Sequence, residues 1–167
     1  MRHLDVPNTA EHCVPLALGF GNVLLGDDGA GVRVVERLRE RFAPSACECI
    51  DGGTLSFNLL PYVEAADAML VVDAAELDAP CGTVAMFEGA AMDDFLSRTR
   101  RRTVHEIGLI DLLDMARLQA RLPPQRALLC VQPGPIGWSG ELSAQVAAAL
   151  PLAVGRAVSL LHRWIAA

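Results

Sequence analysis

The sequence predicts an α/β fold in which a mostly parallel sheet lies between helices. Short apolar runs rich in β-branched residues alternate along the chain with segments whose apolar residues recur at helical spacing. Turn signals containing Gly and Pro separate the two kinds of segment. Because alternating strands and helices build doubly wound sheets, we expect a three-layer sandwich, with a twisted five-stranded sheet and helices on both faces.

The expected strands are short apolar runs, at residues 14–19, 47–50, 68–73, 83–88 and 127–132. The second stops at Asp51-Gly52-Gly53-Thr54, a strong turn signal. We expect the run over 83–88 to be an antiparallel edge strand.

Helices are expected over residues 31–42, 55–64, 107–122 and from 144 onward, with a helical turn over 93–98. The predicted buried faces comprise Val32, Val35, Leu38 and Phe42 in the first helix, and Leu109, Leu112, Leu113 and Ala116 in the third. Ser143 is a suitable N-cap for the last helix, which we expect to kink or restart at Pro151. Its uncharged stretches are too short to span a bilayer, so we expect it to pack on the sheet.

A chain of 167 residues is long enough for one domain with a full core. We expect a loose extension over residues 1–13 and a single domain over residues 14–167, without repeats or linkers. A monomer is the default expectation.

Composition excludes several classes of function. The net charge of −6 argues against nucleic-acid binding. The one basic run, Arg98–Arg102, is read as a solvated loop or as a contact for an acidic partner surface. The chain has no lysine, which excludes a Schiff-base lysine and the lysine of a phosphate-binding P-loop.

The five cysteines are odd in number and form no CxxC pair. We interpret them as small buried hydrophobic residues. Without a signal peptide, a reducing cytoplasm suits them best.

The glycine-rich turn after the first strand does not fit a dinucleotide site. A GxGxxG pattern that starts at Gly19 would need glycine where Leu24 stands. Asp27 and Asp28 would also repel a phosphate at the following helix. One of these two acids can cap the helix while the other faces a cleft.

Three separated polar residues are the candidate site. Asp28 follows the first strand, Asp73 ends the third, and His105 precedes the helix expected over 107–122. The carboxyl ends of parallel strands share one edge of a sheet, where α/β proteins place their sites. Two carboxylates and an imidazole at that edge would form a metal site with room for a substrate. Asp51-Gly52-Gly53-Thr54 could lie against a substrate peptide, although a tight turn explains this segment equally well.

Six segments of the chain, in order, resemble those of the nickel–iron hydrogenase maturation endopeptidases. They are residues 19–32 with the sequence GFGNVLLGDDGAGV, Asp51-Gly52-Gly53-Thr54, Val71-Val72-Asp73-Ala74, Pro80-Cys81-Gly82-Thr83, His105-Glu106-Ile107-Gly108-Leu109 and Val131-Gln132-Pro133. The resemblance extends from Leu16 to Trp164. It differs at Glu106, where many members have Gln, and at Asp28, where some have Glu; Glu106 would add a negative charge near His105.

The resemblance implies a protease that removes a C-terminal extension from the large-subunit precursor of a nickel–iron hydrogenase after nickel insertion. It implies that Asp28, Asp73 and His105 contact nickel that the substrate already holds, so that the site can be empty in the isolated protein. Whether the metal or a carboxylate activates water stays open. Two alternatives remain at this point: a nickel-checking chaperone that binds the precursor without cutting it, and a metallohydrolase for small substrates. The loops Arg98–Arg102 and Gly134–Gly140 are our candidates for partner specificity.

Overall fold

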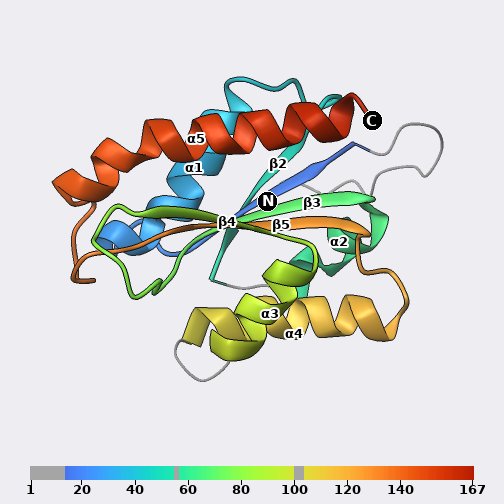
Figure 1. Cartoon of the computed structure of the whole chain (residues 1–167), viewed down its shortest axis with the longest axis horizontal. Coiled ribbons are helices and arrows are strands. Elements are labelled where there is room, and N and C mark those ends of the chain that lie inside the picture. Colours follow the sequence, from blue (N-terminus) through green and yellow to red (C-terminus); the bar gives the residue numbers. More distant parts are fainter. Residues whose placement is uncertain (1–13, 55–56, 100–103) are drawn as a thin grey trace.

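The computed structural model of the chain describes residues 14–54, 57–99 and 104–167, and it has the predicted three-layer α/β architecture (Figure 1). The extension expected over residues 1–13 lies outside the described residues, as does most of the basic run Arg98–Arg102.

The sheet has five strands in the order β2-β1-β3-β5-β4. β1 pairs in parallel with β2 and β3, and β3 pairs in parallel with β5. β4 is antiparallel to β5 at one edge, which confirms the expected edge strand. The strands are β1 (Leu16–Phe20), β2 (Glu48–Gly53), β3 (Ala68–Ala74), β4 (Val84–Glu88) and β5 (Gln125–Val131).

Within the described residues, five α-helices and two short 3-10 turns connect or cover the strands. They are η1 (Gly26–Gly29), α1 (Ala30–Arg39), η2 (Phe57–Leu59), α2 (Leu60–Ala65), α3 (Ala90–Thr99), α4 (Val104–Leu118) and α5 (Ala144–Ile165). Both predicted apolar faces are buried. The first lies in α1 and includes Phe42 just after the helix, and the second lies in α4. The helical turn expected over 93–98 is the longer helix α3.

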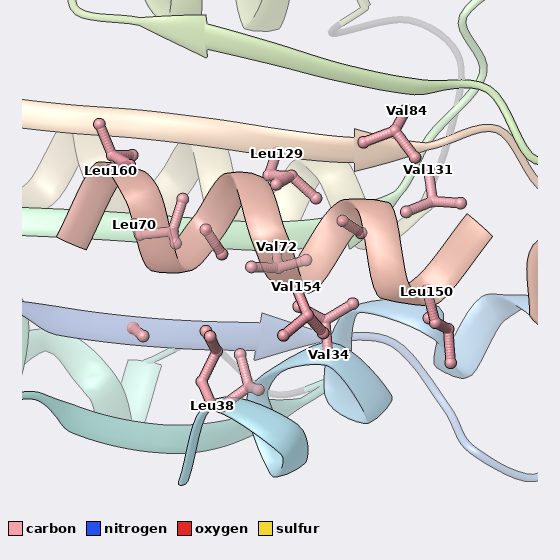
Figure 2. Close-up of a cluster of buried hydrophobic side chains, with 14 of the residues drawn as sticks. Val34, Leu38, Leu70, Val72, Val84, Leu129, Val131, Leu150, Val154 and Leu160 are labelled. Atoms are coloured by element: carbon pink, nitrogen blue, oxygen red, sulfur yellow. The ribbon is translucent and has the colours of Figure 1, made fainter. Parts of the chain in front are cut away.

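Two hydrophobic cores lie on opposite faces of the sheet, because successive residues of a strand point to opposite sides. Leu70 and Val72 of β3 belong to the core under α1 and α5, whereas Met69 and Val71 belong to the core with α2, α3 and α4. Figure 2 shows the first core, in which Val154 of α5 lies among side chains from the strands and from α1.

Helix α5 is long and apolar enough to cross a membrane by length and composition alone. Eight of its apolar side chains nevertheless belong to the core: Val146, Ala149, Leu150, Ala153, Val154, Ala157, Leu160 and Leu161 are buried. We therefore assign it to the sheet, as expected from the sequence. The helix neither ends nor restarts at Pro151, which lies inside one continuous element.

Strand β2 differs from the prediction at its carboxyl end. Asp51 and Gly53 are still in register with Gly19 and Phe20 of β1, and the register shifts between these two pairs. Gly53 has a φ of 53°. The Asp51–Thr54 signal therefore marks an irregular end of the strand itself, and not a turn that follows it.

The start of α1 lies directly against the ends of β1 and β3. A Cβ atom on Gly31 would be 2.3 Å from the carbonyl oxygen of Val72 and 2.5 Å from that of Phe20. A Cβ atom on Gly19 would be 2.7 Å from the carbonyl oxygen of Gly31. These distances are too short for a side chain, so only glycine allows the helix to begin this close to the strands.

We predict that Gly31→Ala lowers the free energy of unfolding by about 3 kcal/mol, because two backbone carbonyls must move. Gly155→Ala is the matched control, since Gly155 is exposed in α5 and its Cβ would meet nothing within 4 Å. This control should gain about 0.5–1 kcal/mol from helix propensity. Urea unfolding measures both variants, and equal effects would contradict the close packing at Gly31.

Candidate active site

The carboxyl edge of the sheet brings together segments that are distant in the sequence. The turn that contains η1 follows β1 there, and the loop between β5 and α5 starts there (Figure 1, left). Helix α4 precedes β5 and ends near the opposite edge, so its first turn also faces the carboxyl edge.

Asp28 lies in η1 and is only 4% exposed. Its Oδ2 accepts a hydrogen bond of 2.8 Å from the backbone N–H of Asn22. The backbone of the same turn packs closely, because a Cβ atom on Gly21 would lie 1.8 Å from the carbonyl oxygen of Asp28. The glycines of this motif thus permit tight folding of the turn around a buried carboxylate.

Asp73 is the second carboxylate at this edge and is also 4% exposed. It lies in β3, in register with Cys130 of β5. By strand alternation it shares a face with Met69 and Val71, the face that α4 covers. Asp73 follows Val72, whose carbonyl oxygen lies against Gly31 of α1. The contact between α1 and β3 therefore brings the segments of Asp28 and Asp73 to one place.

His105 lies inside α4, whereas we expected it just ahead of a helix over 107–122. It belongs to the first turn of that helix, and its side chain lies outside what the structure describes. Across the described part of the chain, no group of three His, Cys, Asp or Glu side chains could hold a metal ion. The structure therefore places two carboxylates and the backbone of the histidine at one edge, and the three-ligand site stays a prediction.

Asp27 has a role that sequence reasoning missed. Its Oδ1 accepts from the backbone N–H of Ser143 at 2.6 Å. Its Oδ2 accepts from the N–H of Gly134 at 2.8 Å and from the hydroxyl of Ser143 at 2.7 Å. We expected one acid of the pair to cap a helix, but the N-caps of η1 and α1 are Leu25 and Gly29, without a side-chain cap.

These bonds make Asp27 the link between η1 and the start of α5. Ser143 is the N-cap of α5, as expected, and its side chain accepts from the N–H of Val146. Three donors occupy most of the lone pairs of the Asp27 carboxylate, whereas a metal ligand needs a free one. Asp27 is therefore poorly suited to bind a metal.

The Asp51–Thr54 segment borders the same edge. The carbonyl of Gly53 accepts a 3.0 Å hydrogen bond from the N–H of Gly21, so the end of β2 is tied to the turn before Asp28. Asp51 Oδ1 accepts from the N–H of Gly53 at 2.9 Å. A Cβ atom on Gly53 would meet nothing within 4 Å, so the segment is open on that side.

Of the cysteines that the structure describes, Cys81 lies beside the Asp27 linkage, with its Sγ 3.7 Å from the hydroxyl oxygen of Ser143. Cys47 and Cys130 are buried as expected, but Cys49 and Cys81 are half-buried. The Sγ atoms of Cys47 and Cys49 lie 3.9 Å apart, at the amino end of the sheet. Hydrogen bonding between the two thiols lowers the pKa of Cys49, with a further contribution from Arg39, and raises that of Cys47.

Comparison with known proteins adds a family to this geometry. A family model described as hydrogenase maturation protease matches residues 32–160. The chain is 37% identical over 152 residues to the hydrogenase expression/formation protein HoxM of Cupriavidus necator. The aligned region covers 89% of this chain and 74% of HoxM. It is 34% identical over 121 residues to the hydrogenase 2 maturation protease of Escherichia coli K12, covering 71% of this chain and 72% of that protein.

Solved structures agree with this assignment. The hydrogenase maturating endopeptidase HybD of Escherichia coli has a TM-score of 0.83 and 29% identity, over 90% of this chain and 93% of HybD. HybD of Thermococcus kodakarensis, a [NiFe] hydrogenase maturation protease, has a TM-score of 0.76 and 27% identity, over 89% of this chain and 99% of that protein.

The shared fold and the named relatives make this protein a hydrolase of the endopeptidase class. More specifically, the chain belongs to the hydrogenase maturation protease family.

We predict that Asp27→Asn costs about 1–3 kcal/mol of unfolding free energy, because an amide nitrogen would face one of the three donors. Glu36→Gln is the control, since Glu36 is an exposed acid in an ion pair with Arg33. This change should cost less than about 0.5 kcal/mol. Urea unfolding measures both, and amide hydrogen exchange at Gly134 and Ser143 should speed up only in Asp27→Asn. Unchanged exchange at these two amides would contradict the linking role.

Proposed function

We propose that this endopeptidase removes the C-terminal extension of a nickel–iron hydrogenase large-subunit precursor after nickel insertion, and that it uses the nickel held by the precursor as its recognition element. The family and the names of its relatives support hydrogenase maturation by proteolysis. The observation that carries the mechanism is the placement of two buried carboxylates, Asp28 and Asp73, at one edge of the sheet.

The donor set suits a divalent metal of the borderline class. Carboxylate oxygens from Asp28 and Asp73 and an imidazole from His105 would occupy part of its coordination sphere. The remaining positions would stay with the precursor. In this arrangement a precursor without nickel lacks the group that holds it against the two carboxylates.

The residues of this chain would hold and orient the bound precursor. Asp28 is fixed by the N–H of Asn22, and Asp73 by its place in a central strand. The Asp51–Thr54 segment is hydrogen-bonded to the turn before Asp28 and would contact the substrate chain near the scissile bond. Nickel at this position would polarise a carbonyl or lower the pKa of a bound water, and either effect favours hydrolysis of a peptide bond. We further propose that the protein works in the cytoplasm as a monomer.

Nickel dependence is the first test. Purified protein should shorten nickel-loaded precursor, and the mass of the large subunit should fall by that of the extension. Nickel-free precursor should stay intact over the same period, because no metal joins it to the carboxylates. Mass spectrometry of both reactions gives the result. Equal cleavage of the two forms would refute recognition through nickel, and stable binding without any mass change would favour a chaperone.

Substitution of two of the three proposed ligands is the second test. Asp73→Asn and His105→Ala should each slow cleavage of loaded precursor by at least about 100-fold, the scale of losing a group that acts at the reacting centre. Asp94→Asn and His162→Ala are matched controls, since both residues are exposed, in α3 and α5. The controls should keep the wild-type rate within about threefold. Normal processing by either test variant would remove that residue from the mechanism.

A further inference from the structure

Three exposed hydrophobic side chains project from the segments that surround the acids. Leu24 is 57% exposed in the turn before η1, and Ile136 and Trp138 are 54% and 85% exposed in the loop between β5 and α5. They account for half of the exposed large hydrophobic residues in the described part of the chain. Single exposed hydrophobic residues are ordinary, but a group of them indicates a binding surface.

Backbone contacts hold the segments of Leu24 and Trp138 beside each other. Ser139, the neighbour of Trp138, donates its N–H to the carbonyl of Leu24 at 3.0 Å. The N–H of Gly26 donates to the carbonyl of Ser139 at 2.7 Å, and Leu25 and Ser139 form a parallel β-bridge. The two chain segments therefore run side by side, and their exposed side chains share one surface.

The same loop is fixed at both ends by the carboxylate of Asp27. Gly134 donates to it before Ile136, and Ser143 donates to it after Trp138. Because the fold has already ordered the loop, a partner that binds there meets a surface whose conformational entropy is already lost. Between Gln132 and Gly140 the chain has no charged residue, so the surface favours an uncharged, apolar partner.

We propose that Leu24, Ile136 and Trp138 form a docking surface for an apolar segment of the hydrogenase precursor close to the bond that is cut. This inference rests on the proposed function and adds the surface that binds the protein part of the substrate. The position supports the precursor as occupant, since Leu24 lies four residues before Asp28 in a turn closed by the Asn22–Asp28 hydrogen bond. A peptide bound at Asp28 would therefore lie close to this surface.

The test compares hydrophobic truncations on this surface and elsewhere. Trp138→Ala and Ile136→Ala should each raise KM for nickel-loaded precursor, Trp138→Ala by at least about tenfold, because large aromatic residues dominate interface energies. kcat should stay within about threefold, since neither residue is placed at the reacting bond. Leu118→Ala is the matched control; Leu118 is 87% exposed at the end of α4, near the opposite edge of the sheet. Its KM should not change.

Fluorescence gives a second readout that does not depend on turnover. Trp138 and Trp164 are the two tryptophans of the chain, so Trp164→Phe leaves Trp138 as the single reporter. Adding loaded precursor to this variant, with Asp73→Asn to prevent cleavage, should shift the emission of Trp138 to shorter wavelength. An unchanged spectrum at saturating precursor would overturn the docking surface.

The outcomes separate the two proposals. If the wild-type protein does not cut loaded precursor, the proposed function fails. If it cuts, and Trp138→Ala and Leu118→Ala have equal KM values, only the docking surface fails. A wild-type dimer at assay concentration that Trp138→Ala converts to monomer would instead assign the surface to a second copy of the chain. A fall in kcat with unchanged KM would also contradict docking, and thermal unfolding of each variant confirms that it is folded.

Discussion

Helix α1 can begin directly on the ends of β1 and β3 because Gly19 and Gly31 place no side chain between helix and strands. This contact between backbones positions the candidate site. Asp27 and Asp28 lie in the turn that leads into the helix, so their position follows from where its first residues lie. The approach to Val72 also fixes their segment relative to Asp73, the next residue of β3.

Burial of two adjacent carboxylates has an energetic cost, and the surrounding backbone offsets it. Removing a charged carboxylate from water costs several kcal/mol, whereas each hydrogen bond to a charged group contributes about 1.5–3 kcal/mol. Asp27 receives three such bonds from Gly134 and Ser143, which makes it well compensated at 2% exposure. The donors come from a segment more than 100 residues away in the chain. The carboxylate therefore stabilises the tertiary fold and not only its own turn.

Those features that local sequence patterns specify were predicted well. Strand positions followed from short apolar runs, and the buried face of α4 followed from the spacing of Leu109, Leu112 and Leu113. The beginning of α4 was placed too late, because the helix starts at Val104 and was predicted from residue 107. β2 was predicted too short because paired glycines signal a turn, although here they form an irregular strand end.

The candidate site was only partly predictable, for a physical reason. Asp73 could be identified because a carboxylate that follows five apolar residues has no local explanation. The different positions of Asp27 and Asp28 could not be predicted from the sequence, because they depend on which of the two carboxylates contacts the loop after β5. In the structure three donors from that loop occupy most of the lone pairs of Asp27, and Asp28 stays the proposed ligand of the pair. The same loop presents Ile136 and Trp138, so one buried carboxylate orders both the acidic edge and the apolar surface beside it.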